Sequence, residues 1–183
     1  MGFVRAGCRF TGGSVLFGGK DLTKMNEVEK RKLWGTKFSY VAQSAAAAFN
    51  PAHRLIKQTI EASVSHKIGK SEDLEKEAIQ LYKEMQLPDP EEIGGRYPHQ
   101  VSGGQLQRTM TAMAMSSKPD LIIFDEPTTA LDVTTQVNVL ATIRNIVKEH
   151  NTAAIYITHD LAVVAQMADR IQVLRYGNTI EES

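Results

Sequence analysis

Residues 121–127 have the sequence LIIFDEP, a wholly apolar run that ends in two adjacent carboxylates and a proline. A continuous apolar run predicts a β-strand buried on both faces, as in a parallel sheet between layers of helices. A second apolar run, residues 153–157, follows one helix-patterned segment later and ends in Thr158-His159-Asp160. Strand, helix and strand in this order predict a right-handed crossover between parallel strands.

The rest of the chain extends this pattern in both directions. Residues 38–41 and 170–174 are further predicted strands, and a long helical block lies between the first of these and residue 121. Four apolar residues at helical spacing mark one buried face of that block: Leu74, Ala78, Leu81 and Met85. We therefore expect an α/β fold with three parts, a partial N-terminal sheet region (1–49), a helical subdomain (50–117) and the rest of the sheet (118–183).

Composition excludes several classes of protein. The 183 residues include 21 Lys and Arg and 21 Asp and Glu, and this zero net charge argues against nucleic-acid binding through bulk positive charge. The single cysteine, Cys8, excludes an internal disulfide. No apolar run approaches the ~20 residues that span a bilayer, and the first residues lack the apolar core of a secretory signal. We expect a cytoplasmic protein that does not bind nucleic acid.

Three polar residues follow the two central strands. Asp125 and Glu126 come directly after one, and His159 follows the other. Ligands of open parallel sheets bind at the carboxyl ends of the strands. There Asp125 could hold Mg²⁺ and Glu126 could polarise a water for attack on a phosphate. The alternatives are a solvated acidic pair at a strand end and a structural histidine.

Ser102-Gly103-Gly104-Gln105 opens a predicted helix. Serine is a good N-cap, and the free amides and dipole of a helix start attract anions. Glycines let a phosphate approach the backbone closely. The alternative is an ordinary serine cap with a flexible entrance.

Five motifs in order carry a family resemblance: Gln43 after a strand, SGGQ at 102–105, LIIFDEP at 121–127, TTALD at 128–132, and Thr158-His159-Asp160. Together they resemble the nucleotide-binding subunit of an ATP-binding-cassette (ABC) transporter, over essentially the whole chain. The resemblance implies a P-loop NTPase-like sheet core with a helical subdomain, and ATP and Mg²⁺ as cofactors.

The resemblance also implies a role for each motif. Gln43 corresponds to the Q-loop glutamine, which touches magnesium or the attacking water. Ser102, Gly103, Gly104 and Gln105 resemble the signature motif, with Val101 in place of its usual leucine, and this motif binds the ATP held by a partner subunit. Asp125 resembles the Walker B aspartate, which holds the metal, and Glu126 the catalytic glutamate. Asp132 resembles the D-loop aspartate, which couples the two sites of a dimer, and His159 the switch histidine.

Residues 43–51, QSAAAAFNP, resemble the corresponding segment of di- and oligopeptide importers. The implied partners are transmembrane permease subunits, a second ABC ATPase subunit and, indirectly, an extracytoplasmic solute-binding protein. The implied location is the inner face of the cell membrane. Ser44, Ala45 and Phe49 depart from the usual residues of that segment and leave the transported solute open.

The family's phosphate-binding loop, G-x-x-x-x-G-K-S/T, has no match before residue 43. Gly19-Lys20 fails because residue 14 is serine and Lys20 is followed by Asp21. We therefore expect a chain truncated at both ends, inactive alone, with the sheet open beside the 121–125 strand. Two other functions stay open: a soluble ABC-type ATPase that acts on DNA or ribosomes, and a non-enzymatic remnant.

Overall fold

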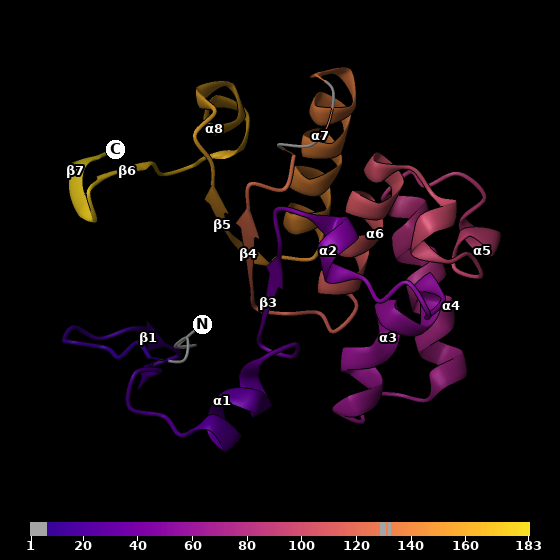
Figure 1. Cartoon of the computed structure of the whole chain (residues 1–183), viewed down its shortest axis with the longest axis horizontal. Coiled ribbons are helices and arrows are strands. Elements are labelled where there is room, and N and C mark those ends of the chain that lie inside the picture. Colours follow the sequence, from indigo (N-terminus) through magenta and orange to yellow (C-terminus); the bar gives the residue numbers. More distant parts are fainter. Residues whose placement is uncertain (1–6, 129–130, 132) are drawn as a thin grey trace.

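The computed structural model describes residues 7–128, 131 and 133–183. Its centre is a three-stranded parallel sheet with strand order β3 (Phe38–Val41), β4 (Leu121–Asp125) and β5 (Ala153–Ile157). On the middle rung, Ile123 lies between Tyr40 and Ile155. All three strands point the same way, so their carboxyl ends meet at one edge, which is uppermost in Figure 1.

Two antiparallel hairpins are not hydrogen-bonded to this sheet. The first joins β1 (Leu16–Phe17) to β2 (Lys20–Asp21), and the second joins β6 (Gln172–Arg175) to β7 (Asn178–Glu182). The first hairpin turns at Gly18-Gly19, where φ is +54° and +77°. These left-handed angles favour glycine, which accounts for the two glycines at the turn.

Several helices begin at a capping side chain, whereas α3 (Leu55–Ser65), α4 (Ser71–Glu84) and α5 (Pro90–Ile93) begin without one. Asn26 forms a capping box with Glu29 at the start of α1 (Glu27–Leu33), and Ser44 caps α2 (Ala45–Ala48). The remaining helices are the 3₁₀ turn Pro98–Gln100, α6 (Gly103–Met115), α7 (Val133–Glu149) and α8 (Leu161–Met167).

Helices α3, α4 and α6 pack together beside the sheet, and α6 also lies against β3. The predicted apolar face of α4 is buried: Leu74, Ala78, Leu81 and Met85 are all at most 6% exposed. Arg108 of α6 donates to the carbonyl oxygens of Met85 and Gln86, at 3.2 and 2.6 Å, and so satisfies the end of α4. The helix that begins at SGGQ is therefore held by both the sheet and the helical block.

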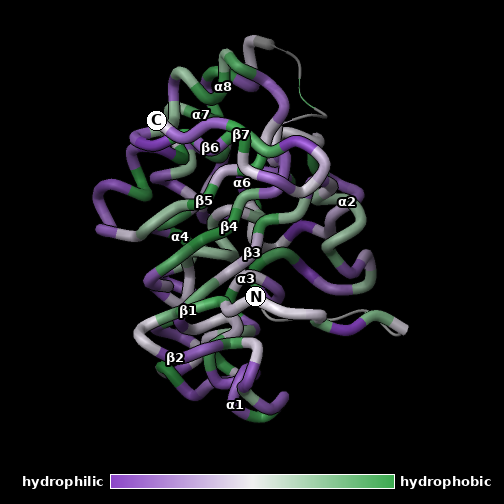
Figure 2. The backbone as a smooth tube through the Cα atoms, turned by 90° about the vertical axis from the view of Figure 1, so that its left-hand side faces the viewer, coloured by the Kyte–Doolittle hydropathy of each residue, from purple (hydrophilic) through white to green (hydrophobic). Residues whose placement is uncertain are grey.

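Burial of the sheet strands differs from the sequence prediction. One face of β4 is fully buried, with Ile122 and Phe124 at 0% exposure beneath α6 and α7. On the other face, Ile155 and Ile157 of β5 are each 48% exposed. Figure 2 shows β3, β4 and β5 side by side on this open face. The prediction that these strands are buried on both faces is wrong for the described residues, because helices cover one face only.

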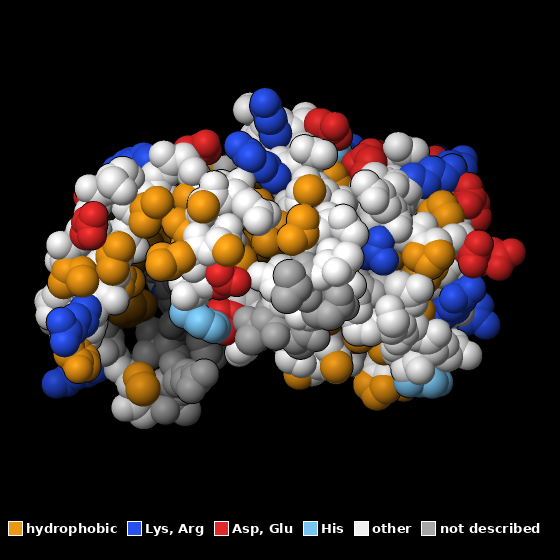
Figure 3. Space-filling model, turned by 90° about the horizontal axis from the view of Figure 1, so that it is seen from above, with side chains coloured by type: hydrophobic (Ala, Val, Ile, Leu, Met, Phe, Trp, Pro, Cys, Tyr) orange, Lys and Arg blue, Asp and Glu red, His pale blue; other side chains and the backbone are white. Residues whose placement is uncertain are grey.

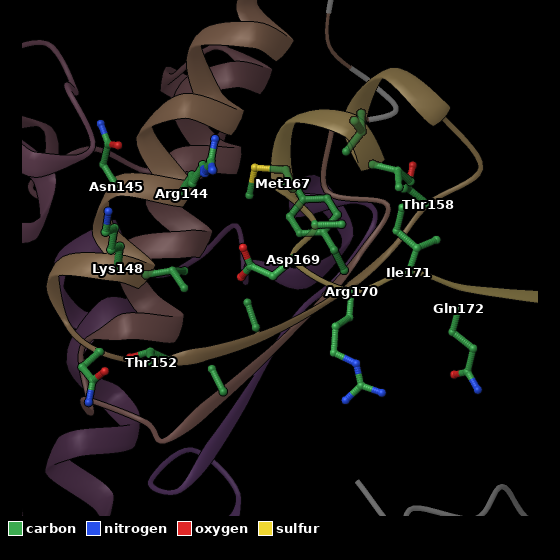
Figure 4. Close-up of a pocket in the computed structure, with 18 residues that line it drawn as sticks. Arg144, Asn145, Lys148, Thr152, Thr158, Met167, Asp169, Arg170, Ile171 and Gln172 are labelled. Atoms are coloured by element: carbon green, nitrogen blue, oxygen red, sulfur yellow. The ribbon is translucent and has the colours of Figure 1, made fainter. Parts of the chain in front are cut away.

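The position of the open sheet edge also corrects the prediction. β4 is the central strand, paired on both sides, so the sheet is not open beside it. Within the described part of the chain, β5 has a partner on one side only. A cleft of about 820 Å³ runs between β5, α7, α8 and residues 169–172. Arg144 and Lys148 line it from α7, with Arg170 and Gln172 across from them (Figure 4).

The predicted third strand, 170–174, appears as β6 (Gln172–Arg175), but it pairs with β7 and does not join the sheet. Strand prediction from apolar pattern places an element along the chain. It does not say which neighbour that element pairs with, because pairing is set by the rest of the fold.

Candidate functional site

Three predicted site residues meet at the carboxyl edge of the sheet. Glu126 lies just past β4, Gln43 just past β3 and His159 just past β5. The Gln43 side-chain amide, Nε2, donates to Oε2 of Glu126 at 3.0 Å, and Nδ1 of His159 lies 2.8 Å from Oε1. Figure 3 looks onto this edge from above and shows a histidine beside acidic side chains, with apolar side chains along one side of them. The structure thus brings together residues that are 83 and 33 positions apart.

The backbone conformation of Glu126 is unusual and sets the direction of its side chain at the edge of the sheet. Its φ is +45°, in the left-handed region that non-glycine residues rarely adopt. Its N–H donates to the Ile157 carbonyl at 2.9 Å, which extends the β4–β5 ladder by one bond before the chain turns. Strained residues of this kind cluster at functional sites. Proline follows at position 127.

The position of His159 is fixed by hydrogen bonds to the next residue, Asp160. Asp160 caps α8 by accepting from the Ala162 N–H at 2.8 Å, and Gln136 of α7 donates to its other oxygen at 3.2 Å. These hydrogen bonds lower the pKa of Asp160, the bond from Ala162 most of all. The His159 side chain is 74% exposed, whereas that of Glu126 is 25% exposed. Glu126 is therefore the shielded member of the pair and His159 is the one open to a ligand.

Asp125 has a partner that the sequence prediction missed. The Tyr40 hydroxyl donates to its Oδ2 at 2.5 Å. This hydrogen bond, followed by desolvation, raises the pKa of Tyr40, because ionisation would place a phenolate beside a carboxylate. In the sequence, Tyr40 is recognisable only as a residue with a high propensity for β-strands. The signal that could have found it is its position on β3, three residues before Gln43 and on the face shared with Asp125.

Ser102 begins α6 as predicted, with a complete capping box. Its hydroxyl accepts from the Gln105 N–H at 3.2 Å, and the Gln105 side chain accepts from the Ser102 N–H at 2.9 Å. A Cβ on Gly104 would lie 3.1 Å from the Thr135 methyl of α7, so a larger residue here would have to displace that side chain slightly. No hydrogen bond found among the described residues joins Ser102–Gln105 to Glu126. Asp132 lies outside the described residues, as do Thr129 and Ala130.

The donor set fits a metal that is shared with a phosphate. No group of three or more metal-ligating side chains occurs in the described ranges. Mg²⁺ usually keeps several waters and is bound by one or two carboxylates together with substrate phosphates. Asp125 supplies one carboxylate of this kind at the same edge as Glu126. This arrangement suits a magnesium ion bound together with a nucleotide better than a metal held by the protein alone.

A second Gly-Lys pair lies in the helical block, at Gly69-Lys70-Ser71. It also fails as a phosphate-binding loop, because residue 64 is valine. It forms the connection into α4, and a Cβ on Gly69 would lie 3.3 Å from the Leu74 side chain. Because Val64 stands where the first glycine would be required, the sequence contains no complete G-x-x-x-x-G-K-S/T loop.

Comparison with known proteins assigns the family. The family model described as "ABC transporter" matches residues 4–129, more than half of the chain. The chain belongs to the ABC transporter family. The Bacillus subtilis oligopeptide transport ATP-binding protein OppD is 39% identical over 172 residues, which are 94% of this chain and 48% of OppD. The Escherichia coli dipeptide transport ATP-binding protein DppD is 38% identical over 181 residues, 99% of this chain and 55% of DppD. The chain thus spans about half the length of these curated relatives.

The fold matches a solved ABC cassette. The dimeric post-hydrolysis structure of the ATP-binding cassette MJ0796, bound to ADP and Pi, aligns with a TM-score of 0.83 at 25% identity. The match covers 96% of this chain and 75% of that one. It confirms the predicted α/β ABC ATPase fold, with its parallel sheet and helical subdomain. Across the residues described, no helix combines the length and apolar character needed to cross a membrane.

Proposed function

We propose that this chain is the ATP-hydrolysing subunit of a membrane importer for peptides. The observation that carries the proposal is the hydrogen-bonded group Gln43–Glu126–His159 at the carboxyl edge of the sheet. Membership of the ABC transporter family and similarity to OppD and DppD support it. Peptide is the proposed solute because both relatives carry that word in their names.

In the proposed reaction, Glu126 acts as general base. It accepts a proton from water as the water oxygen attacks the γ-phosphorus of ATP, and ADP leaves with the electrons of the broken P–O bond. Gln43 orients the carboxylate or the water. If Nδ1 of His159 donates to Glu126, its Nε2 can donate to a γ-phosphate oxygen only as imidazolium. Asp125 would bind Mg²⁺, which neutralises charge on the phosphates.

The site is completed by a second ABC ATPase subunit in this proposal. Ser102 to Gln105 would bind the γ-phosphate of the ATP held by that subunit, and Asp132 would couple the two sites. The subunit would lie on the cytoplasmic face of the membrane, beside its permease subunits and indirectly served by a solute-binding protein.

Contact with the permease provides the test. We expect residues 44–60, which follow Gln43, to face a permease loop. In a Cys8→Ser background, Ala47→Cys on α2 should cross-link to a loop cysteine of the permease, because Ala47 is exposed and follows Gln43 by one helical turn. The matched control is Asn138→Cys, an exposed position on α7. Mass spectrometry of the cross-linked product gives the partner.

Cross-links from Asn138→Cys alone would overturn the proposed orientation. A pull-down that recovers DNA or ribosomes and no permease would favour a soluble ABC-type ATPase. A purified protein that recovers no permease in the pull-down and binds no nucleotide would favour a non-enzymatic remnant.

A further inference from the structure

Tyr40 and Asp125 are related by the geometry of the sheet. Tyr40 lies directly across from Ile123, and Asp125 is two residues further along the same strand. Side chains two apart on a strand share a face, so Tyr40 and Asp125 are diagonal neighbours on the open face. A long aromatic side chain spans a diagonal of this kind, and a shorter residue at position 40 would not reach.

The surroundings of Asp125 make this contact specific. The residue directly across from Asp125 on β5 is Ile157, whose side chain is apolar. The polar contact that the structure gives Asp125 is the Tyr40 hydroxyl, at 2.5 Å from Oδ2. An O–H donor at this distance from a carboxylate forms a strong, charge-assisted hydrogen bond. The bond fixes the rotation of the carboxylate and engages one of its two oxygens.

We propose that Tyr40 is a positioning residue for the magnesium nucleotide: by holding Oδ2 of Asp125, it presents Oδ1 to the cation. The inference rests on the proposed function, in which Asp125 binds Mg²⁺. Tyr40 does not itself touch the metal or the nucleotide. Without its hydroxyl, the carboxylate must be ordered when the metal binds, and part of the binding free energy is lost.

The test compares nucleotide affinity with and without metal. In a transporter whose ATPase subunit is completed with a phosphate-binding loop, the affinity of a non-hydrolysable ATP analogue is measured with saturating Mg²⁺ and again with EDTA. Tyr40→Phe keeps the ring and removes the hydroxyl. We expect it to weaken binding of the Mg²⁺ complex about tenfold, the order expected for one charge-assisted hydrogen bond, and to leave metal-free binding unchanged.

Two reference variants make the result decisive. Tyr176→Phe removes a hydroxyl from a tyrosine that is 91% exposed, and it should change neither affinity. Asp125→Asn should lose the gain from Mg²⁺. Equal weakening of metal-bound and metal-free binding by Tyr40→Phe would overturn the inference, because it would indicate a structural role.

The inference and the proposed function fail in different ways. If Asp125→Asn loses the gain from Mg²⁺ and Tyr40→Phe keeps it, the metal role of Asp125 stands and the role of Tyr40 is wrong. If Asp125→Asn keeps the gain, the proposed metal role of Asp125 is wrong, and the inference about Tyr40 is overturned with it.

Discussion

In a protein completed with a phosphate-binding loop, Glu126→Gln should lower the ATPase rate by ~10²–10⁴, the usual contribution of a general base. The amide keeps the size of the side chain and can still pair with His159 and Gln43, so the edge of the sheet should keep its shape. ATP should still bind, and the variant should accumulate as a dimer with ATP trapped between its subunits. Phosphate release measures the rate, and filter binding measures the retained nucleotide.

Glu149→Gln is the matched control for this variant. Glu149 is an exposed residue at the end of α7, and its loss should leave the rate unchanged. A wild-type rate in Glu126→Gln would mean that another group activates the water. His159 would be the first residue to examine, because its Nδ1 lies 2.8 Å from Glu126.

The second large effect concerns the 183-residue chain alone, which should neither bind ATP tightly nor hydrolyse it. The β- and γ-phosphates need a row of backbone amides and a lysine, and the printed sequence has no complete loop of this kind. Asp125, Glu126 and Asp132 would instead repel a polyanion. The amides of Ser102 to Gln105 would not compensate, since in the proposed arrangement they bind the nucleotide of the other subunit.

Calorimetry of the purified chain with magnesium-ATP measures this directly, with a protein completed by a phosphate-binding loop as the binding control. We expect no heat of binding at micromolar concentrations from the chain alone. A micromolar dissociation constant that is lost in Asp125→Ala would contradict the prediction and would show that the chain contains a phosphate cradle of another kind.

The positions of the three sheet strands, and of the polar residues that follow them, could be predicted from the sequence. Residues 38–41, 121–125 and 153–157 are strands as expected, and Gln43, Glu126 and His159 meet because parallel strands end at one edge. The start of α6 was also predictable, because Ser102 caps it.

Properties that depend on neighbours were not predictable. An apolar strand such as β5 has the same sequence pattern whether one face or both are covered, so the exposure of Ile155 and Ile157 was missed. The pairing of β6 with β7, and the central position of β4, depend on strand order, which residue pattern alone does not encode. The bond between Tyr40 and Asp125 joins residues 85 positions apart, and only the register of β3 and β4 reveals it.

The central claim is that ATP hydrolysis at the Glu126 edge drives peptide import, and peptide uptake by membrane vesicles that contain the transporter tests it most directly. Labelled oligopeptide should accumulate when ATP is present on the side of this subunit, and it should not accumulate with Glu126→Gln. Uptake that is independent of ATP, or equal in wild type and Glu126→Gln, would contradict the account.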